Sequence, residues 1–183
     1  MILAARMVNT PIGPLYVVAN EASVLGLEFG EAHERRDALG KHLQRWLGPH
    51  ELREAADPAG AATRLERYFA GEKGALDEQP VEIHGTEFQR RVWNTLREIG
   101  PGTTWTYTQL AEHIGQPDAR RAVGAANGAN PIALFVPCHR VIAADRTLWG
   151  YGGGLPRKRW LLLHEGAAFA DPGEQGELSL GAM

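Results

Sequence analysis

The sequence predicts an α/β protein in two parts: a small α/β domain over residues 1–80 and a mainly helical domain with a helix-turn-helix over residues 81–168. Three observations support this prediction. Two strand-like runs lie near the start, two capping boxes mark helix starts in the second part, and a helix-like run of mostly Ala and Gly follows the second box. Residues 169–183 are polar and Gly-rich, so we expect a frayed, flexible tail there.

The first part is expected to be a β-hairpin followed by two helices. Residues 15–18 (LYVV) and 24–29 (VLGLEF) have the composition of strands, and residues 19–23 would form the turn between them. Apolar residues at helical spacing predict one helix through Leu39, Leu43, Trp46 and Leu47 and another through Leu65, Tyr68 and Phe69. We interpret the aromatic residues as core. Residues 70–81 mix Gly and Pro with charges and are predicted to be a linker.

Two capping boxes predict the first helices of the second part. Residues 86–89 (TEFQ) and 106–109 (TYTQ) each place a Thr hydroxyl and a Gln amide where they can bond the free N–H groups of a helix start. The first helix would bury Phe88, Val92, Leu96 and Ile99 and stop at residues 100–102 (GPG). The second would end at Gly115.

The next helix is almost bare of side chains. We expect Asp118 to cap it, and we expect it to run through Arg121 to about Gly128. Its small residues are Ala122, Gly124, Ala125, Ala126, Gly128 and Ala129. Each glycine inside a helix costs about 1 kcal/mol relative to alanine, so something is expected to approach this backbone closely. Close packing against another helix and a thin helix that fits a narrow groove, with Arg121 projecting from it, are equally open.

The composition is that of an ordinary globular protein and argues against membrane and secreted classes. No apolar stretch approaches the roughly 20 residues that a spanning helix needs. Residues 1–6 (MILAAR) are too short, and too soon charged, for a signal peptide. The single cysteine cannot form an internal disulfide, so we expect a reducing, cytoplasmic setting.

Charge is unevenly distributed along the chain. The formal net charge of −3 by itself argues against a nucleic-acid binder. Residues 101–160, however, carry seven basic side chains and three acidic ones. A locally basic face on an acidic protein is compatible with binding to a phosphate backbone, although a solvated surface would give the same pattern.

The only cysteine, Cys138, belongs to the sequence PCHRV at residues 137–141. It follows the apolar run 132–136 (IALFV), which predicts a buried strand. A lone Cys is more often a small buried hydrophobe than a reactive group. The thiolate is the reactive form, however, and an adjacent imidazole such as His139 can take the proton. Since packing seldom needs so polar a motif, the pattern favours a nucleophile.

The motifs together resemble the O6-alkylguanine-DNA alkyltransferases, also called methylated-DNA–protein-cysteine methyltransferases. The resemblance rests on Tyr107, residues 122–131 (AVGAANGANP), PCHRV, residues 150–154 (GYGGG) and residues 164–166 (HEG). It covers about residues 84–168, whereas the N-terminal part is similar only loosely, at residues 10–15 (TPIGPL). The resemblance implies a ribonuclease H-like fold for the N-terminal domain.

The resemblance also implies a reaction and a partner. Such proteins bind double-stranded DNA with the recognition helix in the minor groove and flip O6-alkylguanine out of the stack. They then transfer the alkyl group irreversibly to their own cysteine. No cofactor takes part, and each molecule acts once. We expect a monomer, and activity on O4-alkylthymine and cooperative assembly on DNA are left open.

Matching motifs assign catalytic roles to five residues. Cys138 corresponds to the nucleophile, His139 to the base that takes its proton through a water, and Glu165 to the carboxylate that orients His139, as in a triad. Tyr107 corresponds to the phenol that protonates the leaving guanine and crowds the phosphate. Asn130 corresponds to a buried Asn that ties the recognition helix to the Cys138 strand. From the residues alone, Glu165 could also be a solvated helix end and Asn130 a structural cap.

Further matching positions are expected to contact the base or the DNA. The substrate-binding residues would be Val141 through its carbonyl, Trp149, Tyr151 and Gly152. The DNA-binding residues would be Tyr107, Gln109, Arg121, Ala122 and Gly124. Among them, Arg121 would fill the gap that the flipped base leaves in the stack.

Three positions depart from the family pattern, and one of them is Ala133, which offers less apolar wall than the Pro of some members. Trp149 stands where a smaller residue is usual, so we expect a narrowed pocket that accepts methyl groups and reacts poorly with benzyl groups. Gly152 replaces the Ser of some members, which removes a hydroxyl contact but leaves the backbone N–H. No metal site is expected, because the only thiol already has a role and the histidines are scattered.

Three other functions are weighed against this one. A non-catalytic, alkyltransferase-like lesion sensor would lack the nucleophile, which this chain retains as Cys138. A regulator with a fused adaptive-response activator would need a further, cysteine-rich domain. A Cys-His hydrolase or a redox-sensing thiol would need neither the bare helix nor Arg121.

Overall fold

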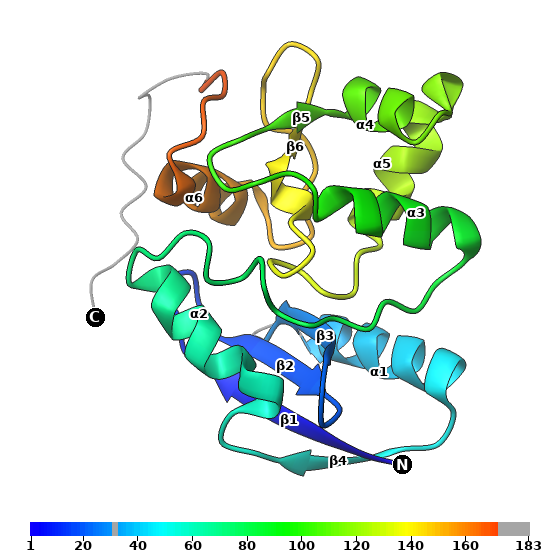
Figure 1. Ribbon diagram of the computed structural model, residues 1–183, viewed down its shortest axis with the longest axis vertical. Helices are drawn as coiled ribbons and strands as arrows, with labels where there is room; N and C mark the ends of the chain where they lie inside the picture. The colour runs from blue at the N-terminus through cyan, green and yellow to red at the C-terminus, as the bar shows by residue number, and fades with distance from the viewer. Residues whose placement is uncertain (31–32, 172–183) are drawn as a thin grey trace.

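The computed structural model describes residues 1–30 and 33–171 and consists of a sheet-containing N-terminal half and a mainly helical C-terminal half (Figure 1). This arrangement confirms the expected fold class. The expected tail lies outside the described residues from residue 172 onward. Among the described residues, no helix has the length and apolarity to cross a bilayer.

The N-terminal half is built on a four-stranded sheet in the order β3-β2-β1-β4. Its strands are β1 (Ile2–Val8), β2 (Leu15–Ala19), β3 (Val24–Phe29) and β4 (Glu51–Glu54). Strand β2 is antiparallel to β1 and β3, and β4 runs parallel to β1. The expected hairpin is confirmed, and its turn is closed by Asn20, whose Oδ1 accepts the N–H groups of Ala22 and Ser23.

Two helices cover opposite faces of this sheet (Figure 1). Helix α1 (His33–Leu47) packs Leu39 and Leu43 on the face that carries Val18. Helix α2 (Ala61–Phe69) packs on the other face, which carries Val17 and is shared with the C-terminal half. One large core therefore joins the two halves of the chain. The expected linker is part of it, since Ala75, Leu76 and Gln79 are buried.

The C-terminal half contains α3 (Glu87–Leu96), α4 (Tyr107–His113), α5 (Arg120–Gly128) and α6 (Leu155–Glu165). Strands β5 (Trp105–Thr106) and β6 (Val141–Ile142) pair in parallel. Both capping boxes are confirmed at α3 and α4. The expected cap at Asp118 is wrong, because this residue lies within the 3₁₀ turn Pro117–Ala119 and Ala119 precedes α5 without a side-chain cap.

The predicted strand at residues 132–136 is also wrong. Leu134 has a φ of 67°, and the segment folds into a tight turn in which Val136 N–H donates to the Ile132 carbonyl. The side chain of Asn130 closes this turn: its Oδ1 accepts Ile132 N–H at 3.0 Å and its Nδ2 donates to the Val136 carbonyl at 2.7 Å. Ala133 N–H also donates to the Leu27 carbonyl, so the turn docks on the edge strand β3 instead of forming a strand of its own.

Candidate active site

Cys138 begins the 3₁₀ turn Cys138–Arg140, is 6% exposed, and lines a cavity of about 290 Å³. The cavity is at the small end of the range for ligand pockets. One wall is formed by Tyr107 and the Gly124 and Gly128 backbone of the two helices of the helix-turn-helix. The loop at residues 150–153 forms another wall. The third comes from the N-terminal half and consists of Glu28, Phe29 and Arg35.

The environment of Cys138 favours the protonated thiol. Burial raises its pKa, and the nearby Glu28 carboxylate adds to this. Asn130 and the charge of Lys158 act in the opposite direction without cancelling the effect of burial. A thiolate therefore has to be formed by passing the proton to another group when the reaction takes place.

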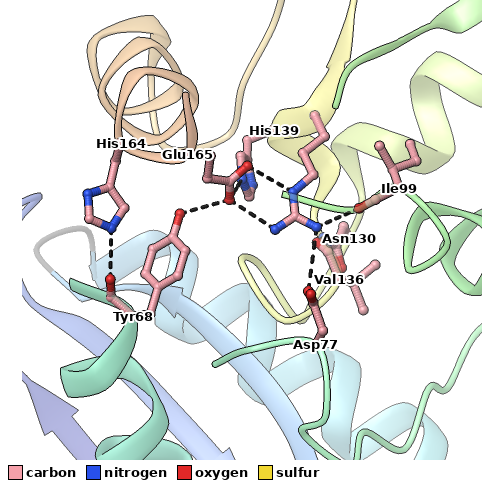
Figure 2. Close-up of polar contacts among 9 residues, drawn as sticks. Tyr68, Asp77, Ile99, Asn130, Val136, His139, His164 and Glu165 are labelled. Atoms are coloured by element: carbon pink, nitrogen blue, oxygen red, sulfur yellow. Dashed lines mark hydrogen bonds and ion pairs between the residues drawn. The ribbon is translucent and has the colours of Figure 1, made fainter. Parts of the chain in front are cut away.

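His139, the residue after Cys138 in the chain, forms a buried pair with Glu165 (Figure 2). His139 Nε2 lies 2.9 Å from Glu165 Oε1, and both side chains are inaccessible to solvent. This burial excludes the solvated helix end as an account of Glu165. Burial lowers the pKa of His139 more than Glu165 raises it, so the imidazole is neutral at rest. Because Nε2–H donates to the carboxylate, Nδ1 carries the lone pair, and Nδ1 is buried without a hydrogen-bond partner among the described residues.

Glu165 is an ionised carboxylate in the protein interior. Burial would raise its pKa, but the neighbouring His139 and the hydrogen bonds and charge of Arg140 hold it well below its usual range. Arg140 donates from Nε to Oε2 and from Nη2 to Oε1, both at 2.9 Å. Tyr68 donates its hydroxyl to Oε1 at 2.8 Å. The carboxylate can thus hold a positive charge on His139 without taking its proton.

Two buried residues near Cys138 were missed by the sequence analysis. Lys158 lies in α6 and donates from Nζ to the carbonyls of Val141 at 2.6 Å and Trp149 at 2.8 Å. Asn127 in α5 lines the cavity, and its Nδ2 lies 3.4 Å from the Cys138 carbonyl oxygen. The sequence could have indicated that Lys158 is buried, because residues 158, 161, 162 and 165 have the spacing of one helix face, and that face of α6 is buried.

The expected base-binding residues do not all reach the cavity. Tyr151 and Gly152 line it, and Tyr151 packs edge-on against Phe29 at 5.7 Å between ring centroids. Val141 is fully buried and does not line the cavity. Its carbonyl oxygen already accepts a hydrogen bond from Lys158 Nζ. Trp149 is 68% exposed and lies outside the cavity wall, so the expected narrowing by its indole is wrong.

The missing side chain of Gly152 leaves space for Arg35 from the N-terminal half. A Cβ at this position would lie 2.6 Å from Nη2 of Arg35. Arg35 in turn donates to Glu28 Oε2 at 3.0 Å. The glycine therefore does more than remove a hydroxyl from the loop, because it admits a guanidinium to the rim of the cavity.

The expected DNA-binding residues lie on α4 and α5, some exposed and some at the cavity. Arg121 and Ala122 are exposed, whereas Gly124 faces Tyr107 at the cavity. Gln109 is exposed, but its Oε1 is used to cap α4 by accepting Thr106 N–H at 2.8 Å. A Cβ at Gly128 would meet nothing within 4 Å, so close packing inside the protein does not account for this glycine.

Comparison with known proteins matches the two halves to two models of one family. Residues 3–83 match the ribonuclease-like domain of 6-O-methylguanine DNA methyltransferase, and residues 87–167 match its DNA binding domain. A methylated-DNA–protein-cysteine methyltransferase of Shigella flexneri is 47% identical over 165 residues, which is 90% of this chain and 96% of that relative. The chain belongs to this methyltransferase family.

Other members of the family agree with this assignment. The Mycolicibacterium paratuberculosis methyltransferase is 56% identical over 161 residues, or 87% of this chain and 90% of that relative. A crystal structure of Mycobacterium tuberculosis OGT in complex with DNA is similar with a TM-score of 0.73 and 40% identity, covering 89% of this chain and 92% of that one. The resemblance seen in the sequence is confirmed.

Proposed function

We propose that this protein repairs O6-alkylguanine in double-stranded DNA by transferring the alkyl group to Sγ of its own Cys138. The observation that carries the proposal is a buried thiol in the wall of a small cavity, followed directly in the chain by His139 of the buried His139–Glu165 pair. Membership of the methyltransferase family supports it and favours an active enzyme over a non-catalytic lesion sensor.

The arrangement supports a direct displacement. The Cys138 proton passes through a bridging water to Nδ1 of His139, and the resulting imidazolium is balanced by Glu165. Sγ attacks the alkyl carbon, an S–C bond forms, and the bond from that carbon to O6 breaks. The guanine leaves with the electron pair and takes a proton from the Tyr107 hydroxyl. A thioether has no easy hydrolytic route back to the thiol, so each molecule acts once.

The bare face of α5 suits a narrow groove. Its outer residues are small, apart from Arg121 and its neighbour Arg120, and they lead directly to the cavity at Gly124 and Gly128. The minor groove is only about 6 Å wide, so a helix stripped to Ala and Gly can approach its floor. Arg121 would then fill the space of the flipped guanine. The relative solved in complex with DNA supports DNA as the partner of this chain.

We also propose the compartment in which the protein works. A thiol that must stay reduced until it meets its substrate fits a reducing, cytoplasmic compartment. All residues of the proposed reaction come from one chain, so we infer that a monomer is sufficient.

The decisive experiment is an intact-mass measurement after mixing the protein with an equimolar duplex that holds one O6-methylguanine, followed by peptide mapping. We expect one added methylene on the peptide that contains Cys138, and no addition in Cys138→Ala. An unchanged mass together with lesion-preferring DNA binding would indicate a sensor instead. An unchanged mass without DNA binding would overturn the proposal.

A further inference from the structure

Tyr68 connects the N-terminal half to the buried pair of the candidate active site. It lies near the end of α2, is fully buried, and donates its hydroxyl to Glu165 Oε1 at 2.8 Å across 97 positions of sequence (Figure 2). None of the residues expected to take part in the reaction belongs to the N-terminal half. The sequence pattern predicts Tyr68 as a core residue, which its burial confirms, but a core role does not account for its hydroxyl.

The hydroxyl of Tyr68 completes the set of donors around Glu165. Oε1 receives His139 Nε2, Arg140 Nη2 and Tyr68 Oη, and Oε2 receives Arg140 Nε. Arg140 is itself held by the Ile99 carbonyl and by Asp77, whose Oδ1 lies 3.6 Å from Nη1. Three of these four hydrogen bonds come from the 3₁₀ turn Cys138–Arg140 and the fourth comes from α2, so the docking of α2 on α6 adds one of the donors that orient the carboxylate.

That docking is fixed by contacts of its own. His164, the residue before Glu165, lies with Nε2 2.7 Å from the Tyr68 carbonyl oxygen, and the two rings pack edge-on at 4.9 Å (Figure 2). Phe69 packs against Trp160 at 5.6 Å. The Tyr68 ring thus packs edge-on against His164 and also against Phe69, at 5.1 Å between centroids, and its hydroxyl donates to one carboxylate oxygen.

We propose that Tyr68 is a positioning residue for alkyl transfer, which holds Glu165 so that it receives Nε2–H of His139 and leaves Nδ1 free to accept the Cys138 proton. The inference rests on the proposed function. It gives the N-terminal half a part in the chemistry that is separate from DNA binding.

Removing the hydroxyl has an effect of predictable sign. In Tyr68→Phe, Glu165 Oε1 loses one hydrogen-bond donor. Fewer donors then stabilise its negative charge, so it attracts Nε2–H of His139 more strongly. The imidazolium is then favoured, which raises the pKa of His139. More molecules hold a proton on Nδ1 at a given pH, and the acid limb of the pH–rate profile moves to higher pH. The other charged groups acting on the pair, Arg140, Lys158 and Asp77, are left in place.

The test compares the full-length wild type, Tyr68→Phe and Tyr16→Phe. Tyr16 is a matched control, because it is a half-buried tyrosine of β2 that belongs to the separate core cluster under α1. The single-turnover rate of transfer from a duplex with one O6-methylguanine is measured across the range in which histidine titrates, together with DNA affinity and melting temperature. The His139 ring is titrated in parallel by NMR.

We expect Tyr68→Phe to react roughly fivefold more slowly near neutral pH, because Glu165, and with it His139, loses one of the hydrogen bonds that orient it. Its acid limb and its His139 titration should both move to higher pH, while DNA affinity stays the same and Tyr16→Phe behaves as wild type. Replacing Tyr68 by 3-fluorotyrosine keeps the ring and strengthens the donor, so both shifts should reverse. This second variant also covers the case in which Tyr68→Phe folds poorly.

Two results would overturn the inference. If Tyr68→Phe melts at a lower temperature but keeps the wild-type rate, pH profile and His139 titration, the hydroxyl serves only stability. If the wild type itself transfers no alkyl group to Cys138, the proposed function fails and the inference with it. The wild-type reaction thus separates the two failures.

Discussion

The two halves of the chain contribute to the candidate site in different ways. The C-terminal half supplies a contiguous motif around Cys138 and the helix that carries Glu165. The N-terminal half supplies isolated side chains from three separate elements. Glu28 of β3 and Arg35 of α1 line the cavity, and Tyr68 of α2 donates to the Glu165 carboxylate. The C-terminal residues, including the positioning residues Glu165 and Asn130, could be recognised from sequence motifs, whereas the contributions of the N-terminal half become visible only when the two halves are packed together.

The largest expected effect comes from a buried ion pair in the C-terminal half, compared with an exposed one in the N-terminal half. Glu165→Ala leaves the Arg140 guanidinium buried without its bidentate partner, which we expect to cost about 3–5 kcal/mol of unfolding free energy and to abolish transfer. Glu51→Ala breaks the Arg53–Glu51 pair on the exposed strand β4 and should cost less than about 1 kcal/mol. Denaturant unfolding measures both, and similar losses in the two variants would contradict the comparison.

Two asparagines that close turns offer the next comparison. Asn130→Ala leaves the buried Ile132 N–H without a partner and takes one of the two hydrogen bonds from the Val136 carbonyl, which keeps Cys138 N–H, so we expect a loss of about 2–4 kcal/mol. It also removes a contact that lowers the pKa of Cys138, so transfer should slow. Asn20→Ala opens the exposed hairpin turn of the N-terminal half and should cost about 1 kcal/mol. An Asn130 variant as stable as the Asn20 variant would show that the buried turn does not depend on this side chain.

The buried Lys158 is expected to make the free energy of unfolding depend on pH. Burial lowers its pKa from 10.5 to about 8 in the folded protein. Between about pH 8 and 10.5 the unfolded chain binds more protons at this residue, so its contribution to the free energy of unfolding rises with pH, by up to about 3 kcal/mol. We expect this rise to disappear in Lys158→Met and to persist in Lys41→Met, which replaces an exposed lysine of α1. Parallel stability–pH curves for wild type and Lys158→Met would refute the prediction.

Local signals account for most of what the sequence predicted correctly. The two capping boxes and the Asn20 hairpin are formed by residues within four positions of one another. What was missed depends on distant partners. Strand β1 (ILAARMV) has a single charged residue, and all four residues of β4 are exposed, so neither shows a clear alternation of apolar and polar residues.

The errors at the candidate site have the same origin. The apolar run 132–136 looks like a strand until the side chain of Asn130 and the positive φ of Leu134 turn it back on itself. The indole of Trp149 was expected in the cavity because it neighbours Gly150 in sequence. Its exposure shows that neighbours in a loop can face opposite ways.

The smallest expected effect is at the rim where the two halves meet. In Gly152→Ser the new Cβ would lie 2.6 Å from Arg35, so the guanidinium must move and its bond to Glu28 must weaken. Because the Arg35 side chain is flexible, the effect should be modest. We expect the ratio of the transfer rate from O6-benzylguanine to the transfer rate from O6-methylguanine to change about fivefold. Trp149→Ala, by contrast, should change this ratio by less than about twofold, because its indole lies outside the cavity wall. Single-turnover rates with both substrates measure the ratio. A larger change in Trp149→Ala than in Gly152→Ser would mean that the loop, and not the N-terminal half, limits the size of the alkyl group.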